Sequence, residues 1–97
     1  MPATAYHVIY QTFTRRDHQA EVGKRILVSE YFFQQDAAIA RYCQLMDEDS
    51  IYKESIHLPQ PSDIEDFINR QGYYARGREA DNGNPEKNWR IVKITIQ

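Results

Sequence analysis

The stretch 29-SEYFFQQDAAIARYC-43 contains the point at which a strand pattern gives way to a helix pattern. Residues 26–33 are rich in β-branched and aromatic side chains and have apolar residues on both faces, so we expect a strand inside a sheet. Over residues 35–47 the apolar side chains recur at helical spacing and define one face of a helix: Ala38, Ile39, Tyr42, Cys43 and Met46. The chain therefore combines sheet and helix.

Three further strands are predicted, over residues 6–13, 51–58 and 89–96. Each is rich in β-branched or aromatic residues, and the last one alternates apolar side chains between its two faces. Residues 14–24 are mostly polar and predict a long connecting loop between the first two strands.

The stretch 62-SDIEDFINRQG-72 carries the signals of a complete short helix. Ser62 and Glu65 have the spacing of a capping box, Arg70 lies in the last turn, and Gly72 stands where a helix often ends in a left-handed conformation. The predicted buried stripe consists of Ile64, Phe67 and Ile68.

The segment over residues 73–79 can form a short edge strand, paired with the last strand through a turn at Asn82 and Gly83, because Asn-Gly favours hairpin turns. The expected order is β-β-α-β-α-(β)-β. Residues 1–97 then form a single α+β domain, with one mixed four- or five-stranded sheet and two helices packed on one face.

Length and composition restrict the class of protein. The chain has 97 residues and one cysteine, so an internal disulfide is impossible and a thiol-rich zinc site lacks ligands. No apolar run approaches the roughly 20 residues of a membrane span, and we expect a cytoplasmic protein without a membrane partner. Seven tyrosines, four phenylalanines and a tryptophan should leave apolar surface exposed in so small a domain, which favours a homodimer.

Charge is unevenly distributed along the chain. Residues 1–29 hold four bases and two acids, residues 30–66 hold two bases and nine acids, and residues 67–97 hold six bases and three acids. This pattern is typical of solvated faces, and it is also what a molecule with one acidic and one basic surface would have.

No motif for catalysis, a cofactor or a metal is present. His7, His18 and His57 have no ligand spacing, and Cys43 lies on the apolar face of the first helix, where it packs as a small hydrophobic residue. We therefore expect no cofactor, no metal site and no enzymatic activity.

Two groups of residues are candidates for binding a partner. The first group is acidic and lies at the end of the first helix: Asp47, Glu48 and Asp49. The helix macrodipole disfavours acids at this end, so helix stability does not explain them, and they would suit a basic partner. The second group is basic and aromatic and follows the second helix: Tyr73, Tyr74, Arg76 and Arg78. Its rings can stack on bases and its arginines can donate hydrogen bonds to phosphate. Arg15 and Arg16 would contribute if their loop lies nearby.

The passage over residues 29–43 is similar to the strand-to-helix passage of short accessory proteins carried by phages and mobile elements. The resemblance covers this segment and implies no site residue. We expect a small non-enzymatic module that binds a protein partner or itself. The alternatives are a nucleic-acid-associated accessory protein that uses residues 73–78, and a small dimeric α+β enzyme.

Overall fold

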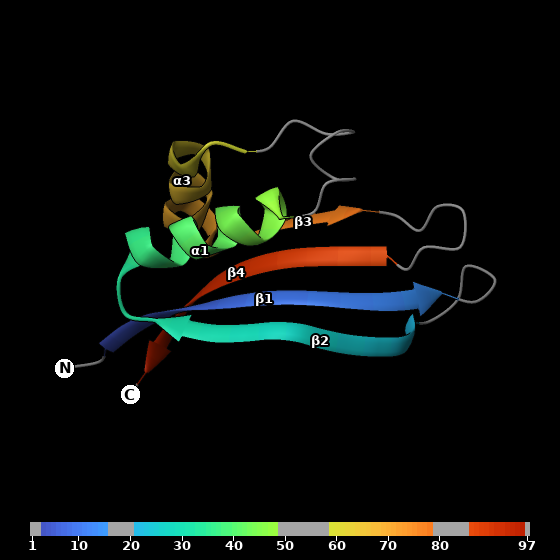
Figure 1. Ribbon diagram of the computed structural model, residues 1–97. Coiled ribbons are helices and arrows are strands. Elements are labelled where there is room, and N and C mark those ends of the chain that lie inside the picture. The colour runs from blue at the N-terminus through green and yellow to red at the C-terminus, as the bar shows by residue number, and fades with distance from the viewer. Residues whose placement is uncertain (1–2, 16–20, 49–58, 79–85, 97) are drawn as a thin grey trace.

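The computed structural model describes residues 3–15, 21–48, 59–78 and 86–96 (Figure 1). Its elements follow in the order β1 (Ala3–Arg15), β2 (Glu21–Phe32), α1 (Gln35–Asp47), α3 (Pro61–Gln71), β3 (Tyr73–Arg78) and β4 (Glu86–Ile96). The strand predicted over residues 51–58 and the predicted Asn82-Gly83 turn lie outside the described residues.

The strands form one sheet in the order β2-β1-β4-β3. All three ladders between described strands are antiparallel, so the prediction of a mixed sheet was wrong. β1 and β4 are the central strands and pair with each other. β2 pairs with the other side of β1, and β3 pairs with the other side of β4, so none of these pairs needs a parallel crossover. The predicted strand over residues 73–79 is confirmed as β3, which pairs with β4 along all six of its residues.

The first two strands form a longer hairpin than the sequence indicates. β1 continues to Arg15 and β2 begins at Glu21, so the predicted loop over residues 14–24 was too long. A shift in register between Tyr10 and Gln11 lets the long pair bend while both strands continue.

β2 lies at an edge of the sheet and not inside it, which corrects the prediction from its apolar composition. Val28 and Phe32 pack against the core, whereas Tyr31 on the opposite face is 63% exposed. Apolar residues on both faces of β2 therefore do not mean that both faces are buried within this chain.

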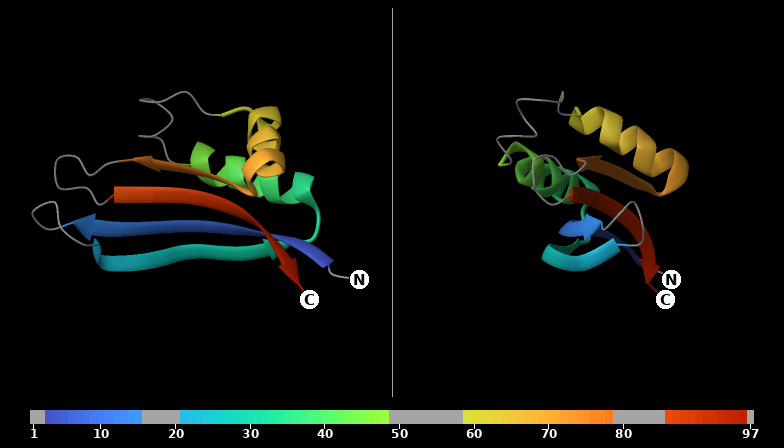
Figure 2. Two further views of the ribbon diagram at one scale, coloured as in Figure 1. Left: turned by 180° about the vertical axis from the view of Figure 1, so that it is seen from behind. Right: turned by 90° about the vertical axis from the view of Figure 1, so that its right-hand side faces the viewer.

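The two described helices, α1 and α3, pack on the same face of the sheet, as predicted. Strand side chains of that face and side chains from both helices form one core cluster: Tyr6, Val8, Ala38, Ile39, Tyr42, Leu45, Met46, Ile64, Ile68, Tyr74, Trp89 and Ile91. α1 lies over the central strands and α3 lies beside it over β3 (Figures 1 and 2). The Tyr42 hydroxyl donates a buried hydrogen bond of 2.8 Å to the Trp89 carbonyl oxygen, which ties α1 to β4.

The two helices match their predicted ranges closely, but the start of α3 differs. Its first residue is Pro61 and its N-cap is Gln60, without a side-chain capping bond, so the predicted capping box of Ser62 and Glu65 is wrong. Proline at the first helical position has the right φ and needs no hydrogen bond there. The end is as predicted, because Gly72 adopts φ 86° in the left-handed region.

Candidate functional site

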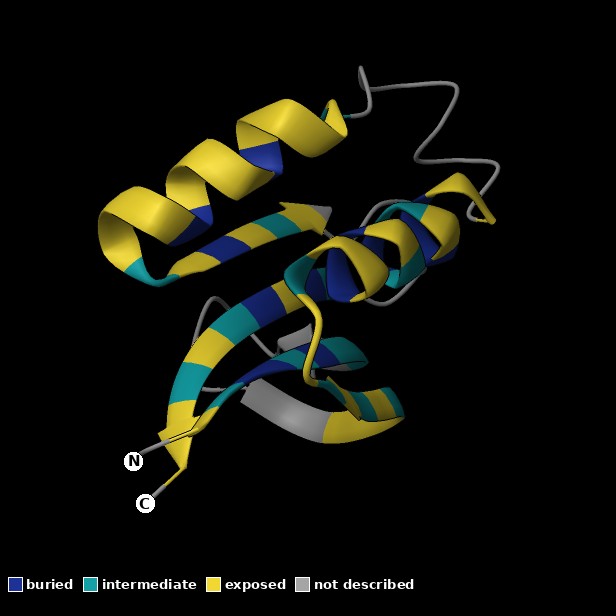
Figure 3. Cartoon of the chain, turned by 90° about the vertical axis from the view of Figure 1, so that its left-hand side faces the viewer, coloured by how far each residue is buried: buried dark blue, intermediate teal, exposed yellow. Residues whose placement is uncertain are grey.

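Side chains alternate between the two faces along β3, so Tyr73 and Tyr74 lie on opposite faces of the sheet. Tyr73 is 44% exposed on the face without helices, whereas Tyr74 is 6% exposed and lies beneath α3. Figure 3 shows the resulting alternation of buried and exposed residues along β3. Arg76 is half-buried on the helix side, and the side chain of Arg78 lies outside the described part of the structure.

Tyr74 is a core residue. Its ring meets the Tyr42 ring edge-on, with centroids 5.8 Å apart, and lies 5.2 Å from the Phe67 ring. Arg76 Nη1 donates to the Tyr74 hydroxyl at 3.4 Å. Tyr74 is therefore inaccessible to a partner, and residues 73–78 do not present one continuous basic aromatic surface.

The predicted arginines of the first loop are partly described. Arg15 ends β1 opposite Glu21, and Arg16 lies outside the described residues. Both Thr12 and Arg78 pair with Lys87, so the C-terminal ends of β1 and β3 lie at the same end of the sheet on either side of β4. With strands about 4.8 Å apart, this register leaves about 10 Å between β1 and β3.

A row of apolar and aromatic residues crosses the face of the sheet that α1 and α3 leave uncovered, here called the open face. The ladder pairs His7 with Tyr31, His7 with Val92, and Val92 with Tyr73, so these four residues span all four strands. The view from behind in Figure 2 shows neither described helix crossing β1 and β2 on this side. On the same face, Ala5 pairs with Ile94. The open face is thus apolar over its middle.

His7 lies near the centre of this row. Its ring stacks on Tyr31 with centroids 4.1 Å apart and planes 6° apart, and its Nε2 atom lies 2.7 Å from Ser29 Oγ. Burial, and secondarily the positive charge of Arg90, lower the pKa of His7 below its ordinary value of 6.5. Arg90 is the one charged side chain at the open-face positions of the described strands from residue 3 to 11 and from residue 88 to 96.

The helix layer is acidic. From residue 35 to 48 and from 61 to 71 it carries six acids, Asp36, Asp47, Glu48, Asp63, Glu65 and Asp66, against two bases, Arg41 and Arg70. Arg41 is engaged by Glu30 of β2, with Nε 2.7 Å from Oε1. Asp47 and Glu48 are exposed, as the predicted acidic docking site requires, and Asp49 lies outside the described residues.

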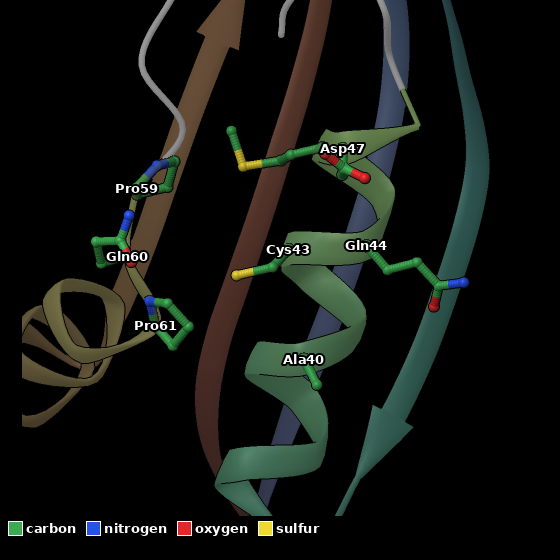
Figure 4. A pocket seen from close by; sticks show the side chains of 8 residues that line it. Ala40, Cys43, Gln44, Asp47, Pro59, Gln60 and Pro61 are labelled. Carbon is green, nitrogen blue, oxygen red and sulfur yellow. The ribbon is translucent and has the colours of Figure 1, made fainter.

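A hollow of about 460 Å³ lies between α1 and the segment before α3. Figure 4 shows Cys43 pointing from α1 toward Pro59 and Pro61 across this space. Burial raises the pKa of the Cys43 thiol, so the group is protonated at neutral pH and is a poor nucleophile or metal ligand. We therefore assign no reaction and no ligand to this hollow.

In the part of the chain that the structure describes, no three His, Cys, Asp or Glu side chains are placed to hold a metal ion. Neither of the described helices is long and apolar enough to cross a membrane. Comparison of the chain with protein-family models, curated proteins and solved structures gives no match.

The structure brings together a group that the sequence did not single out, the row across the open face. Tyr31 and Val92 were visible as apolar residues on the second face of their strands. Their alignment with His7 and Tyr73 depends on the pairing of strands up to 85 residues apart in the chain, since 92 minus 7 is 85, and no local pattern encodes that register.

Proposed function

We propose that this chain is a non-enzymatic protein-interaction module and that its open face binds a second copy of the chain. The single observation that carries the proposal is the row formed by Tyr31, His7, Val92 and Tyr73 on a face that the described helices leave uncovered. Aromatic residues are enriched in protein interfaces because they bury a large area at a small cost in conformational entropy.

The size of the open face suits a weak dimer. Four strands about 4.8 Å apart and nine residues with a rise of about 3.4 Å give a face of about 19 by 30 Å, or roughly 600 Å². Two such faces bury roughly 1,200 Å² in total, at the lower limit of standard interfaces, the size range in which weak and transient complexes are found. Sheets pack face to face at about 30°, which a two-fold axis through the open face permits.

His7 and Arg90 determine how much it costs to bury the open face. The pKa of His7 lies below its ordinary value of 6.5, so at neutral pH most copies carry an uncharged ring, which costs less to desolvate than an ion. Arg90 is exposed beside Ile9 and Ala75 in the ladder, and its long side chain can extend to the rim and stay hydrated. A cytoplasmic setting is part of the proposal and agrees with the free thiol of Cys43.

The alternatives have less support. A nucleic-acid surface on residues 73–78 requires Tyr74, which lies in the core, although Arg78 and Lys87 share one end of the sheet. The rings of His7 and Tyr31 stack on each other, which leaves their inner faces closed to bases. A small dimeric enzyme is the third alternative, and the sequence offers no catalytic motif for it. An origin in a phage or mobile element stays a prediction, because the comparisons give no relative.

Sedimentation equilibrium from low to high micromolar concentration tests the proposal. The wild-type chain should associate to a dimer, and Tyr31→Lys should weaken the association constant by about tenfold or more, because it removes an aromatic contact and buries a charge. Ala40→Lys is the matched control, since it adds the same charge at an exposed position of α1 and should leave association unchanged. A wild-type chain that stays monomeric, or equal association of Tyr31→Lys, contradicts the proposal.

A further inference from the structure

Among the described residues of the open face, His7 is the one whose charge changes near neutral pH. Its ladder partners are Tyr31 on β2 and Val92 on β4, so it lies within the apolar row. The imidazole stacks on the Tyr31 ring with centroids 4.1 Å apart, and its Nε2 atom lies 2.7 Å from Ser29 Oγ. These two contacts hold the ring against the sheet, so its charge changes at a fixed position on the open face.

The groups that face His7 do not compensate a positive charge on its ring. On β2 it faces the phenol of Tyr31, and tyrosine is uncharged near neutral pH. On β4 the charged group is Arg90, which is itself positive and opposes protonation of His7. Along β1 its neighbours on the same face are Ala5 and Ile9, which are apolar.

No acid lies on this face around His7 in the described part of the chain. Open-face positions without Asp or Glu occupy four described stretches: 3–11, 29–31, 73–77 and 88–96. Glu30 lies on the helix side of β2, where its Oε1 atom is 2.7 Å from Arg41 Nε. A second copy docked through the same face brings the same residues, so these stretches of the second copy offer no carboxylate to a protonated His7 either.

Protonation also changes the hydrogen bonds that the His7 ring requires. An ionised imidazole has two N–H donors. Ser29 Oγ can accept from Nε2, whereas no described residue forms a hydrogen bond with Nδ1. In the single chain the ring is half-buried and water can reach it, but under a second sheet the Nδ1 donor would lack a partner. A charged ring is therefore costly to bury in the proposed interface.

Arg90 is charged at every pH of interest, but its charge can leave the interface. Its side chain is exposed and long enough to carry the guanidinium to the rim, where it stays hydrated. The side chain of His7 is short and held by Ser29 and Tyr31, so its charge would stay beneath the second copy. A positive charge on His7 therefore opposes self-association more strongly than the charge of Arg90 does.

We propose that His7 makes self-association through the open face pH-dependent: the uncharged ring permits the dimer, and protonation on mild acidification dissociates it. This inference rests on the proposed self-association and names how it is regulated. Burial, and secondarily the charge of Arg90, lower the pKa of His7 in the single chain, and burial under a second copy lowers it further. The dimer then binds fewer protons than two single chains, so the association constant falls as pH falls below 6.5.

Sedimentation equilibrium at two pH values tests the inference. Each dimer contains two copies of His7, so the association constant should fall by about fivefold or more between about pH 7.5 and about pH 5.5. Net charge acts in the opposite direction, because the sequence pI is about 5.9 and repulsion between copies is weakest near it. Fluorescence of Trp89, which is fully buried, shows whether the chain stays folded at both pH values.

Three variants assign the pH dependence to His7. His7→Gln carries no charge, so the ratio of its association constants at the two pH values should be close to one, whatever its affinity. His7→Phe keeps a ring that can stack on Tyr31, and it replaces the glutamine variant if that variant associates too weakly to measure. Arg90→Gln removes the nearby positive charge, so the pKa of His7 should rise and dissociation should begin at a higher pH.

NMR of the imidazole signals measures the same linkage without a substitution. The titration midpoint of His7 should move to lower pH as the protein concentration rises and the dimer forms. If the chain dimerises equally at both pH values, if this midpoint is independent of concentration, or if His7→Gln and His7→Phe keep the pH dependence, the inference is wrong while the proposed self-association stands. A chain that is monomeric at the higher pH overturns both proposals, so the two failures are distinguishable.

Discussion

Replacing each of the two adjacent tyrosines of β3 by alanine should have very different effects on stability. Tyr74 is 6% exposed, so truncation removes nearly a whole buried aromatic side chain. At about 25 cal/mol per Å² and about 150–200 Å² of lost area, the cost is about 4 kcal/mol, within the range for aromatic-to-alanine changes in cores. Tyr73 is 44% exposed and has its open side toward solvent, so its truncation should cost about 1 kcal/mol.

The assay is urea unfolding followed by tryptophan fluorescence. The chain has one tryptophan, Trp89, which is fully buried and therefore reports the core. A domain of this size has a free energy of unfolding of about 5–15 kcal/mol, so Tyr74→Ala removes a large fraction of it. If Tyr74→Ala does not fold, Tyr74→Leu keeps most of the apolar volume and should give an intermediate midpoint. Equal midpoints for Tyr73→Ala and Tyr74→Ala, with equal slopes, would refute the assignment of the two faces.

Three further predictions concern single positions. Ser62→Ala should change the free energy of unfolding by less than about 0.5 kcal/mol, because Ser62 is exposed within the first turn of α3 and is not its N-cap. A loss of about 1 kcal/mol would show that Ser62 caps the helix after all. Gly72→Ala should cost about 1–2 kcal/mol of unfolding free energy, since φ is 86° although the space around it is open, and Gly72→Asn should cost less. The pKa of His7 is lowered on folding, so the unfolded chain takes up the proton first and the free energy of unfolding falls as pH falls below 6.5; His7→Gln should remove this part of the pH dependence of the urea midpoint.

The helices were predictable because their signals are local. The apolar spacing over residues 35–47 matches α1, and Gly72 ends α3 in the expected conformation. The capping box failed because the helix begins at Pro61, two residues earlier than an N-cap at Ser62 would place it, and Ser62 lies within its first turn. Proline at the first helical position is itself a helix-start signal, and the sequence analysis did not consider it.

The sheet was predictable in content but not in arrangement. β2 has apolar residues on both faces, which usually indicates an internal strand. In the described structure it is an edge strand with Phe32 against the core and Tyr31 at the surface. Strand order and register depend on contacts between distant segments, so the row across the open face could not be read from any window of the sequence.

The sequence grouped Tyr73 with Tyr74 and Arg76 because they are neighbours in the chain. A strand separates neighbours, and each direction that β3 presents has its own chemistry: Tyr73 extends the apolar row of the open face, Tyr74 closes the core beneath α3, and the backbone of Ala75 points to the outer edge. The proposed self-association through the open face therefore uses one of these directions, the one that Tyr73 takes. The acids concentrated in the helix layer lie beside the edge, whereas the open face carries little charge. This difference in charge is why the proposed partner of the open face is a second, equally apolar face.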